Sequence, residues 1–257
     1  MIVLEYAAYT DPGRVRHRNE DNYYIDGKWK ARDEKLFWTE GSVQEHLTAA
    51  VCDGMGGTAK GEAASSIAIQ LLAEHCKKKN NIDFSDILQL VNNEICQEIQ
   101  AHGQSMGTTF AGMNISGQKM TFANIGDSRI YRLRKGKLKQ LSQDHSVVQR
   151  MVRIGLLTEA EARKHPQRHQ ITQYLGIRQE EMMIEPQIEE DIQIENGDRY
   201  LLCSDGLTDM LSDEEIEKIM NACRTVKDTV EKLWDAAIKN GGADNITVIL
   251  LEVQEKN

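Results

Sequence analysis

The sequence predicts an α+β fold in which antiparallel sheets pack together and carry helices on their outer faces. Two turns, Ser-Gly at 116–117 and Lys-Gly at 135–136, separate β-patterned runs and indicate hairpins. The stretches YLLC (200–203) and ITVILLEV (246–253) are apolar at nearly every position, so both faces of these strands are expected to be covered. Together with amphipathic helices in pairs, this excludes a one-layer sheet.

Nine strands are expected along the chain, most of them short. Runs rich in β-branched and apolar residues, bounded by glycine, asparagine or aspartate, define them. Their ranges are 2–10, 22–27, 47–52, 107–115, 118–125, 129–134, 187–194, 198–203 and 245–253.

Helices are indicated by capping residues and by apolar residues that recur every three or four positions. Two long amphipathic stretches, 60–78 and 83–101, lie between the third and fourth strands. A further helix ends at Gly241 and places its apolar residues on one face. Three sites fit an N-terminal capping box, the last with aspartate in place of the usual Glu or Gln: Thr158 with Glu161, Ser212 with Glu215, and Thr225 with Asp228.

Composition narrows the functional classes. The 257 residues contain no linker-like tract or repeat, so a single domain over 1–257 is expected. The net charge of −9 argues against nucleic acid as the main partner. Five scattered cysteines without a CxxC pair indicate reduced thiols and a cytoplasmic protein. No apolar run approaches the ~20 residues that span a bilayer, and no signal peptide or membrane association is expected.

The stretch VCDGMGGTAKGEAASS ends an apolar strand on Asp53 and continues with three glycines within four residues. Residues 54–59 fit the GxGxxG/A pattern of dinucleotide-binding loops. However, Asp53 would place a negative charge beside the pyrophosphate, and Glu74, the next acidic residue at the right distance, lies late in a helix. A Walker loop is excluded because Lys60 is followed by Gly61. An anion-binding loop is therefore disfavoured.

Carboxylates recur at strand ends beside glycine or other small residues, which favours a cation site. Gathering several buried anions costs several kcal/mol each unless they are paired. Oxygen ligands of this kind suit hard ions such as Mg²⁺ and Mn²⁺. Each carboxylate alone is better explained as a turn or cap residue, so the recurrence is the signal. The residues concerned are Glu20, Asp21, Asp53, Asp127, Asp205 and Asp244.

Eight segments of the chain share their order with those of a known family: VRHRNED, VCDGMGGTAKGEAAS, GTTFAG, ANIGDSRIY, LSQDHS, ITQYLG, LLCSDGLTDMLSDEEI and GGADNITVILLEV. They resemble the metal-dependent protein phosphatases, the type 2C serine/threonine phosphatases, and specifically their compact bacterial branch. The resemblance runs from about Thr10 to Val253. It implies a four-layer α-β-β-α sandwich, with two antiparallel sheets face to face, antiparallel helix pairs outside, and a small flap at about 144–176.

The resemblance also implies a centre with two Mn²⁺ or Mg²⁺ ions and a third, weaker metal position. Its catalytic set comprises Arg16, Asp53, Asp205 and Asp244, with Arg16 gripping the substrate phosphate. The implied metal contacts are Asp53 as the bridging ligand, the Gly54 carbonyl, Asp205, Asp244, Glu20 and Asp21 largely through water, and Asp127 with Asp205 at the third position.

The activity implied is hydrolysis of phosphoserine and phosphothreonine in proteins by a metal-activated water, in one displacement without a phosphoenzyme. Expected partners are phosphorylated proteins, including bacterial Ser/Thr kinases, and the protein is expected to be a monomer. Animal-type members carry a histidine where this chain has Met55. The general acid therefore stays open between metal-bound water and His17.

Three other functions are alternatives to phosphoprotein hydrolysis. A degenerate phosphatase fold that only binds phosphoproteins should have lost a ligand such as Asp53, and none of the three central aspartates is missing. Small phosphoesters or phosphorylated anti-anti-sigma proteins are alternative substrates that the sequence separates poorly from kinase-pathway proteins. A dinucleotide-binding oxidoreductase comes last. The cationic flap either meets the substrate or is a solvated cap.

Overall fold

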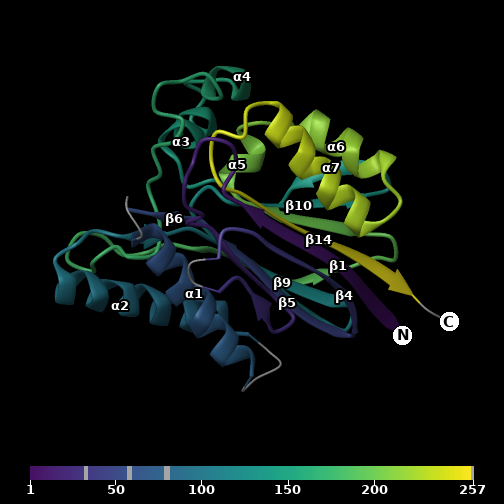
Figure 1. Ribbon diagram of the computed structural model, residues 1–257, viewed down its shortest axis with the longest axis horizontal. Coiled ribbons are helices and arrows are strands. Elements are labelled where there is room, and N and C mark those ends of the chain that lie inside the picture. Colours follow the sequence, from purple (N-terminus) through teal and green to yellow (C-terminus); the bar gives the residue numbers. More distant parts are fainter. Residues whose placement is uncertain (32–33, 57–59, 78–81, 256–257) are drawn as a thin grey trace.

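The computed structural model of the protein describes residues 1–31, 34–56, 60–77 and 82–255 (Figure 1). Two six-stranded antiparallel sheets form its centre, with strand orders β11-β10-β13-β14-β1-β4 and β12-β9-β8-β5-β2-β3. We call them the first and the second sheet. The first contains β1 (Ile2–Asp11), β4 (Phe37–Gln44), β10 (Arg129–Arg134), β11 (Lys137–Gln140), β13 (Arg199–Cys203) and β14 (Ile246–Glu255).

The second sheet contains β2 (Asn22–Ile25), β3 (Lys28–Trp29), β5 (His46–Cys52), β8 (Phe110–Ser116), β9 (Lys119–Ile125) and β12 (Gln187–Gln193). A separate two-stranded ladder joins β6 (Gly54–Met55) to β7 (Gly107–Thr108).

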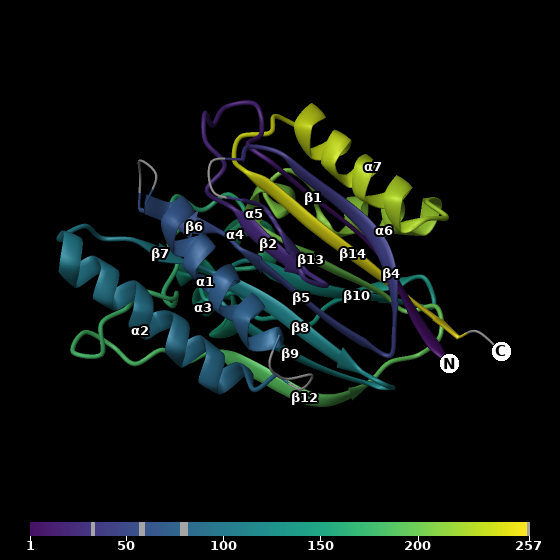
Figure 2. The same cartoon turned by 60° about the horizontal axis from the view of Figure 1, so that its bottom comes forward.

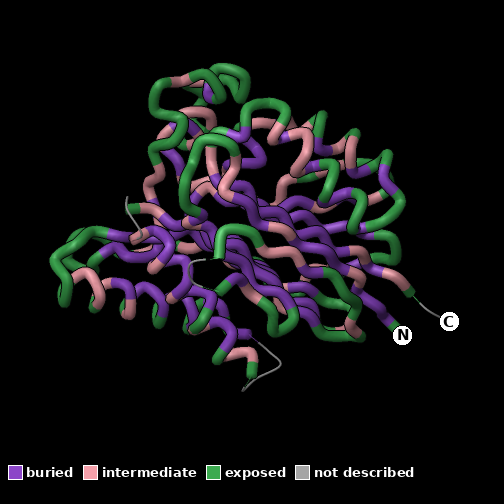
Figure 3. The backbone as a smooth tube through the Cα atoms, in the orientation of Figure 1, coloured by how far each residue is buried: buried purple, intermediate pink, exposed green. Residues whose placement is uncertain are grey.

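The two sheets pack face to face and bury one hydrophobic core between them. Strand β1 shows the pattern, because Leu4, Tyr6 and Ala8 face this inner core while Ala7 faces the helices outside. Figure 3 shows the buried strands running through the middle of the molecule. Every residue of β13 is buried, which the apolar stretch 200–203 predicts and which extends to Arg199 as well.

Helices cover the outer face of each sheet (Figures 1 and 2). The pair α1 (Lys60–Cys76) and α2 (Phe84–His102) packs on the second sheet. The pair α6 (Asp213–Ala222) and α7 (Val226–Lys239) packs on the first. The predicted α-β-β-α sandwich is therefore confirmed. Residue 78, the expected end of the first helix, lies outside the described residues, as do 57–59 of the glycine-rich segment.

The capping predictions hold in two cases and are incomplete in the third. Full capping boxes start α6 at Ser212 and α4 (Glu159–Ala162) at Thr158. At α7, Thr225 accepts the Asp228 N–H at 3.1 Å, but no reciprocal bond is formed. Aspartate is one methylene shorter than glutamate, which explains why its carboxylate does not return to the N-cap N–H.

A small flap between β11 and β12 carries α3 (Val147–Arg153) and α4, and it projects beside the short helix α5 (Asp205–Thr208) in Figure 1. Its Arg163 pairs with Asp213 of α6 at 3.2 Å, which joins the flap to the body.

Four strands, β3, β4, β6 and β11, were not among the nine expected, and one expected strand is divided. Strand β4 was not expected, because its sequence FWTEGSVQ alternates weakly and contains Gly41. Gly41 lies opposite Tyr6 of β1, and a Cβ there would lie 2.7 Å from the Tyr6 hydroxyl, so the glycine makes room for that ring. The expected strand 107–115 is interrupted at Thr109, whose backbone and side chain bind Asp53 instead.

In the described part of the chain, no helix combines the length and apolarity needed to cross a membrane. All five cysteines are free thiols, and Cys52 and Cys203 are fully buried strand residues.

Candidate metal centre

A pocket of about 500 Å³ opens at the end of the two sheets where the flap projects. Residues from seven separate segments of the chain line it, and they include every predicted site residue except Asp21. The predicted residues in the lining are Arg16, Glu20, Asp53, Gly54, Asp127, Asp205 and Asp244.

Asp53 is held at the end of β5 by its own backbone. Its N–H donates to Thr109 Oγ1 at 2.9 Å, and its carbonyl accepts both the Thr109 N–H and the Thr108 hydroxyl at 2.9 Å. Thr109 is fixed in turn by a 2.7 Å hydrogen bond with Ser128. These contacts explain why the strand breaks at Thr109, and they leave the Asp53 carboxylate directed to the pocket.

Glycine is required after Asp53 because three segments meet there. A Cβ on Gly54 would overlap the Gly61 carbonyl and lie 2.6 Å from the Glu20 carbonyl. A Cβ on Gly61 would lie 2.5 Å from the Gly54 carbonyl oxygen. The start of α1 and the Glu20 loop can therefore approach Asp53 only at glycines. The reason is close approach, since Gly54 has no left-handed backbone.

A similar approach brings Asp205 beside Asp244. Asp205 begins α5 directly after β13, and Asp244 precedes β14. A Cβ on Gly206 would overlap the carbonyl of Asn245, so glycine lets the two strand ends touch. Two motifs about 40 residues apart in the chain thus contribute neighbouring carboxylates.

Asp21 does not line the pocket and is fully buried. Its Oδ2 accepts hydrogen bonds from Ser204 and Thr247, each at 2.7 Å. Its Oδ1 is buried without a hydrogen-bond partner among the described residues, and the same is true of Asp205 Oδ1. Such orphaned acceptors are costly in a protein interior, so they indicate that a group is meant to bind there.

The raised pKa values of the carboxylates also indicate that a positive partner binds in the pocket. Burial, followed by the repulsion of neighbouring carboxylates, raises the pKa of Asp53 and of Asp205 well above its ordinary value. Burial raises the pKa of Asp21 to about 6. Burial, with the nearby Asp144 charge, raises the pKa of Asp127 to about 7. The protein alone does not balance this negative charge.

The donor set fits hard divalent cations. Carboxylate and carbonyl oxygens surround the pocket, no cysteine lines it, and the orphaned Asp21 and Asp205 oxygens lack only a positive partner. Mg²⁺ and Mn²⁺ prefer such oxygen ligands. The residues therefore fit the ions that the sequence predicted.

Arg16 is positioned at the mouth of this pocket. Its Nη2 donates to Asp244 Oδ2 at 2.7 Å, and its side chain is 57% exposed. The other guanidinium N–H groups make no hydrogen bond within the described residues. A planar fork with free donors at the rim is suited to pair with two oxygens of a phosphate.

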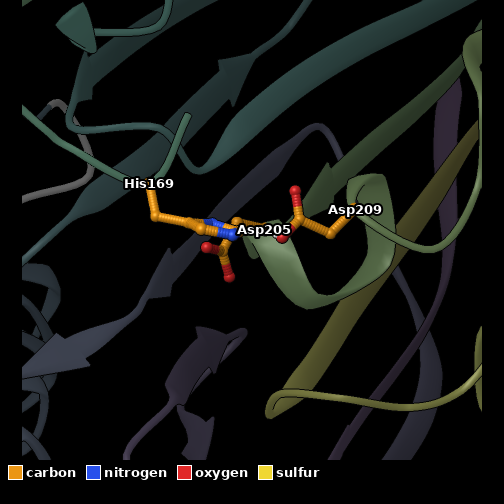
Figure 4. A group of neighbouring side chains, drawn as sticks. All are labelled: His169, Asp205 and Asp209. Atoms are coloured by element: carbon orange, nitrogen blue, oxygen red, sulfur yellow. Dashed lines mark ion pairs between the residues drawn. The ribbon is translucent and has the colours of Figure 1, made fainter. Parts of the chain in front are cut away.

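Two residues that sequence reasoning missed also reach the pocket region (Figure 4). His169 extends from the flap toward Asp205 and Asp209, with its Nδ1 3.3 Å from the Asp209 carboxylate. Ligand atoms of the three residues lie within 4.8 Å of one another. Asp209 follows Asp205 by four residues, one helical turn, and this spacing was the available signal. Nothing in the sequence marked His169.

Asn245 is a third residue that was missed. Its Oδ1 accepts the Glu20 N–H at 2.8 Å, and its Nδ2 donates to the carbonyls of Pro12 at 3.1 Å and Arg18 at 2.8 Å. Ser65 of α1 binds the same loop, donating to the Glu20 carbonyl at 2.6 Å. These bonds fix the loop that carries Arg16. The sequence at 243–245, ADN, predicts a plain turn, so it does not reveal that Asn245 holds the Arg16 loop.

An oxygen-rich cation site beside an exposed guanidinium with unused N–H donors is the arrangement expected of a metal-dependent hydrolase of phosphate esters. Comparison with known proteins agrees, because the family model for Protein phosphatase 2C matches residues 30–250. The chain therefore belongs to the protein phosphatase 2C family and is a protein phosphatase.

Several curated relatives are similar over nearly the whole chain. The serine/threonine phosphatase stp of Listeria monocytogenes serotype 4b (strain F2365) is 33% identical over 95% of this chain and 93% of its own length. Protein phosphatase PhpP of Streptococcus pneumoniae (strain ATCC BAA-255 / R6) is 34% identical over 99% of both chains. Serine/threonine protein phosphatase PstP of Mycobacterium tuberculosis is 34% identical over 98% of this chain, which spans 45% of that protein.

Solved structures show the same architecture. The crystal structure of the M. tuberculosis serine/threonine phosphatase PstP/Ppp superposes with a TM-score of 0.82 at 32% identity, covering 98% of this chain and 100% of that one. The PstP catalytic domain in complex with two manganese ions gives a TM-score of 0.79 at 32% identity, with 99% and 100% covered.

Proposed function

We propose that this protein hydrolyses phosphoserine and phosphothreonine in phosphorylated proteins, using two Mn²⁺ or Mg²⁺ ions and a third, weaker metal position. The observation that carries the proposal is the convergence of carboxylates on one pocket with two buried, orphaned carboxylate oxygens. The relatives named serine/threonine phosphatases and the two manganese ions of the PstP structure support it.

The convergence of these segments on one pocket supports the proposed ligands. Asp53 and the Gly54 carbonyl come from the β5–β6 turn, Asp205 and Asp244 from the adjoining strand ends, and Glu20 from the Arg16 loop. Asp21 contributes its orphaned oxygen, and Asp127 serves the third position. When bound, the divalent ions supply the positive field that acidifies water and neutralises the phosphoryl oxygens.

The chain's own residues position the substrate. Arg16 pairs with phosphate oxygens through the guanidinium donors that Asp244 leaves free. Asn245 and Ser65 hold the Arg16 loop, so the guanidinium is preorganised. Met55 lines the pocket and carries no proton to donate, whereas His17 and His169 bring imidazoles to its wall. The flap contributes His169 and is proposed to meet the segment around the phosphorylated residue.

The proposed substrates are phosphoproteins of a bacterial Ser/Thr kinase system, including the kinases themselves. We propose a cytoplasmic monomer in which 1–257 form one phosphatase domain with its flap at about 144–176. The net charge of −9 argues against nucleic acid as the main partner.

Phosphate release from a phosphothreonine peptide tests this function. The parent should be active with Mn²⁺ or Mg²⁺ and inactive with excess chelator. Asp205→Asn should lose nearly all turnover, while Asp86→Asn, which removes an exposed carboxylate of α2, should keep the parent rate. Metal-independent turnover, or full activity in Asp205→Asn, would contradict the proposal.

A further inference from the structure

A second pocket, of about 450 Å³, lies on the outer face of the first sheet beside its edge strand β4. Tyr9 of β1 and Trp38 of β4 are direct cross-strand partners there, and Trp234 of α7 closes the third side. The charged residues around them are Glu231, Lys232 and Asp235 of α7. We call this the aromatic pocket. Within the described part of the chain, it shares no lining residue with the pocket of the candidate metal centre, the catalytic pocket.

The two tryptophan rings lie at steep angles to the Tyr9 ring, which contacts both of them. Tyr9 lies between the two tryptophans, with ring centres 5.7 Å from Trp38 and 5.4 Å from Trp234. The rings are inclined to Tyr9 by 54° and 84°, so their faces are not stacked flat on one another. All three side chains are partly exposed and pack their inner edges on the helix-side core. Aromatic faces arranged in this way attract a cation.

The structure already places a cation on this cluster. Lys227 Nζ lies 5.7 Å from the centre of the Trp38 ring and pairs with Glu40 at 3.2 Å. Lys227 does not line the aromatic pocket, so its position leaves the pocket open. Trp38 is therefore a cation-accepting ring in this protein.

The rim of the aromatic pocket also provides a carboxylate that can pair with a bound cation. Glu231 makes no ion pair or side-chain hydrogen bond within the described residues, whereas Asp235, one helical turn later, pairs with Lys239. Glu231 is thus a free anion beside three aromatic rings. Lys232 carries the one opposing charge among the lining residues.

We propose that the aromatic pocket binds the guanidinium of an arginine in an exposed segment of a partner protein. Guanidinium is planar and weakly hydrated, stacks on aromatic faces, and pairs with carboxylates as a fork. A net charge of −9 favours partners with basic segments. The inference goes beyond the proposed catalytic function and does not depend on it, because binding here requires neither metal nor turnover.

Tryptophan fluorescence tests the proposal directly. The chain has three tryptophans, and the third, Trp29, lies on β3 in the other sheet, so Trp29→Phe leaves only the two pocket tryptophans as reporters. This protein is titrated with the peptide acetyl-GRGRG-amide and with the same peptide carrying citrulline, the neutral isostere of arginine. We expect a saturable change in fluorescence with the arginine peptide. We expect the citrulline peptide to bind at least about fivefold more weakly. Indole N–H NMR signals of the unmodified protein provide the same readout if Trp29→Phe folds poorly.

Variants then locate the site. Glu231→Gln should weaken arginine-peptide binding about threefold or more and Lys232→Gln should strengthen it, while Glu190→Gln, an exposed control on β12, should leave it unchanged. Trp38→Leu should abolish it. Hydrolysis of a small aryl phosphate should be unaffected by all four. Absence of saturation, equal binding of the citrulline peptide, or unchanged binding by Glu231→Gln would overturn the proposal.

Discussion

An aspartate lies at each end of strand β13, fully buried at Asp198 and partly exposed at Asp205, and the protein treats the two in opposite ways. Asp198 precedes the strand, far from the catalytic pocket, and Asp205 follows it at the pocket. One carboxylate is satisfied by the protein itself. The other is left with an orphaned oxygen.

Asp198 is 1% exposed and fully hydrogen-bonded. Arg134 donates to both of its oxygens, at 2.7 and 2.6 Å, and the Tyr200 hydroxyl and the Glu195 N–H add bonds of 2.9 and 2.8 Å. Burial alone would raise the pKa of Asp198, but these hydrogen bonds outweigh it and lower the pKa overall. This carboxylate stabilises the fold.

At Asp205, burial and the carboxylates of neighbouring segments raise the pKa instead, and among the described residues no arginine pairs with it as Arg134 pairs with Asp198. The chain can therefore satisfy a buried aspartate and does so where only structure is needed. The difference indicates that the anions of the catalytic end are reserved for cations supplied from outside the chain.

The largest expected effect comes from removing the unsatisfied carboxylate. Asp205→Asn should lower kcat/KM for a phosphothreonine peptide at least about 10²-fold, because electrostatic stabilisation of the transition state is lost. The melting temperature without added metal should stay the same or rise, since a repelled anion has been removed. Steady-state kinetics and thermal unfolding check both. If Asp205→Asn kept its activity but unfolded more easily than the parent, Asp205 would be a structural residue, and the contrast with Asp198 would be contradicted.

The satisfied carboxylate should give the complementary result. Asp198→Asn should lower the free energy of unfolding by about 3 kcal/mol, because Arg134 loses its buried partner. The kcat/KM of the folded fraction should match the parent. Urea denaturation combined with kinetics measures the two quantities. Loss of activity without loss of stability would remove the distinction between the two strand ends.

Neutral hydrogen bonds at the catalytic end should have a smaller effect. Asn245→Ala removes three bonds to the Arg16 loop and should cost about 2 kcal/mol of unfolding free energy. It should also raise KM for a phosphopeptide more than it lowers kcat, because Arg16 loses its fixed position. Asn196→Ala, which removes one exposed bond to the Glu255 N–H, is the matched control. Equal effects of the two variants would deny Asn245 a positioning role.

The smallest expected effect is a pH dependence. The folded-state pKa of Asp198 is lowered, so its contribution is fully present above its unfolded value of about 3.9 and is lost as pH falls through the folded value. The stability difference between the parent and Asp198→Asn should thus be constant from neutral pH to about pH 4 and shrink below it. Denaturation at a series of pH values measures this. A difference that grows in acid would contradict the assignment.

Most of the fold could be predicted from local patterns. The apolar runs of β13 and β14, the hairpin turns and the capping residues all reflect short-range rules that tertiary packing left intact. Strand β4 could not, because Gly41 is explained only by the Tyr6 ring across the ladder. The break at Thr109 likewise depends on a contact with a residue more than 50 positions away.

The candidate site could be predicted only as a recurrence of carboxylates. Local sequence marks strand ends at Asp53 and Asp205, but it does not show which ends meet. Resemblance to the phosphatase family supplied that convergence, together with Arg16. Asn245 and His169 were missed because their roles lie in long-range contacts, one to a loop 225 residues away in the chain and one from the flap to α5.

Carboxylates from remote segments are proposed to form one site for divalent ions. Calorimetric titration of Mn²⁺ into metal-free protein measures this binding. We expect the parent and Asp198→Asn each to bind two ions with matching affinity, and Asp205→Asn to lose one ion or to bind at least about tenfold more weakly. Undiminished binding by Asp205→Asn, or no binding by the parent, would contradict it.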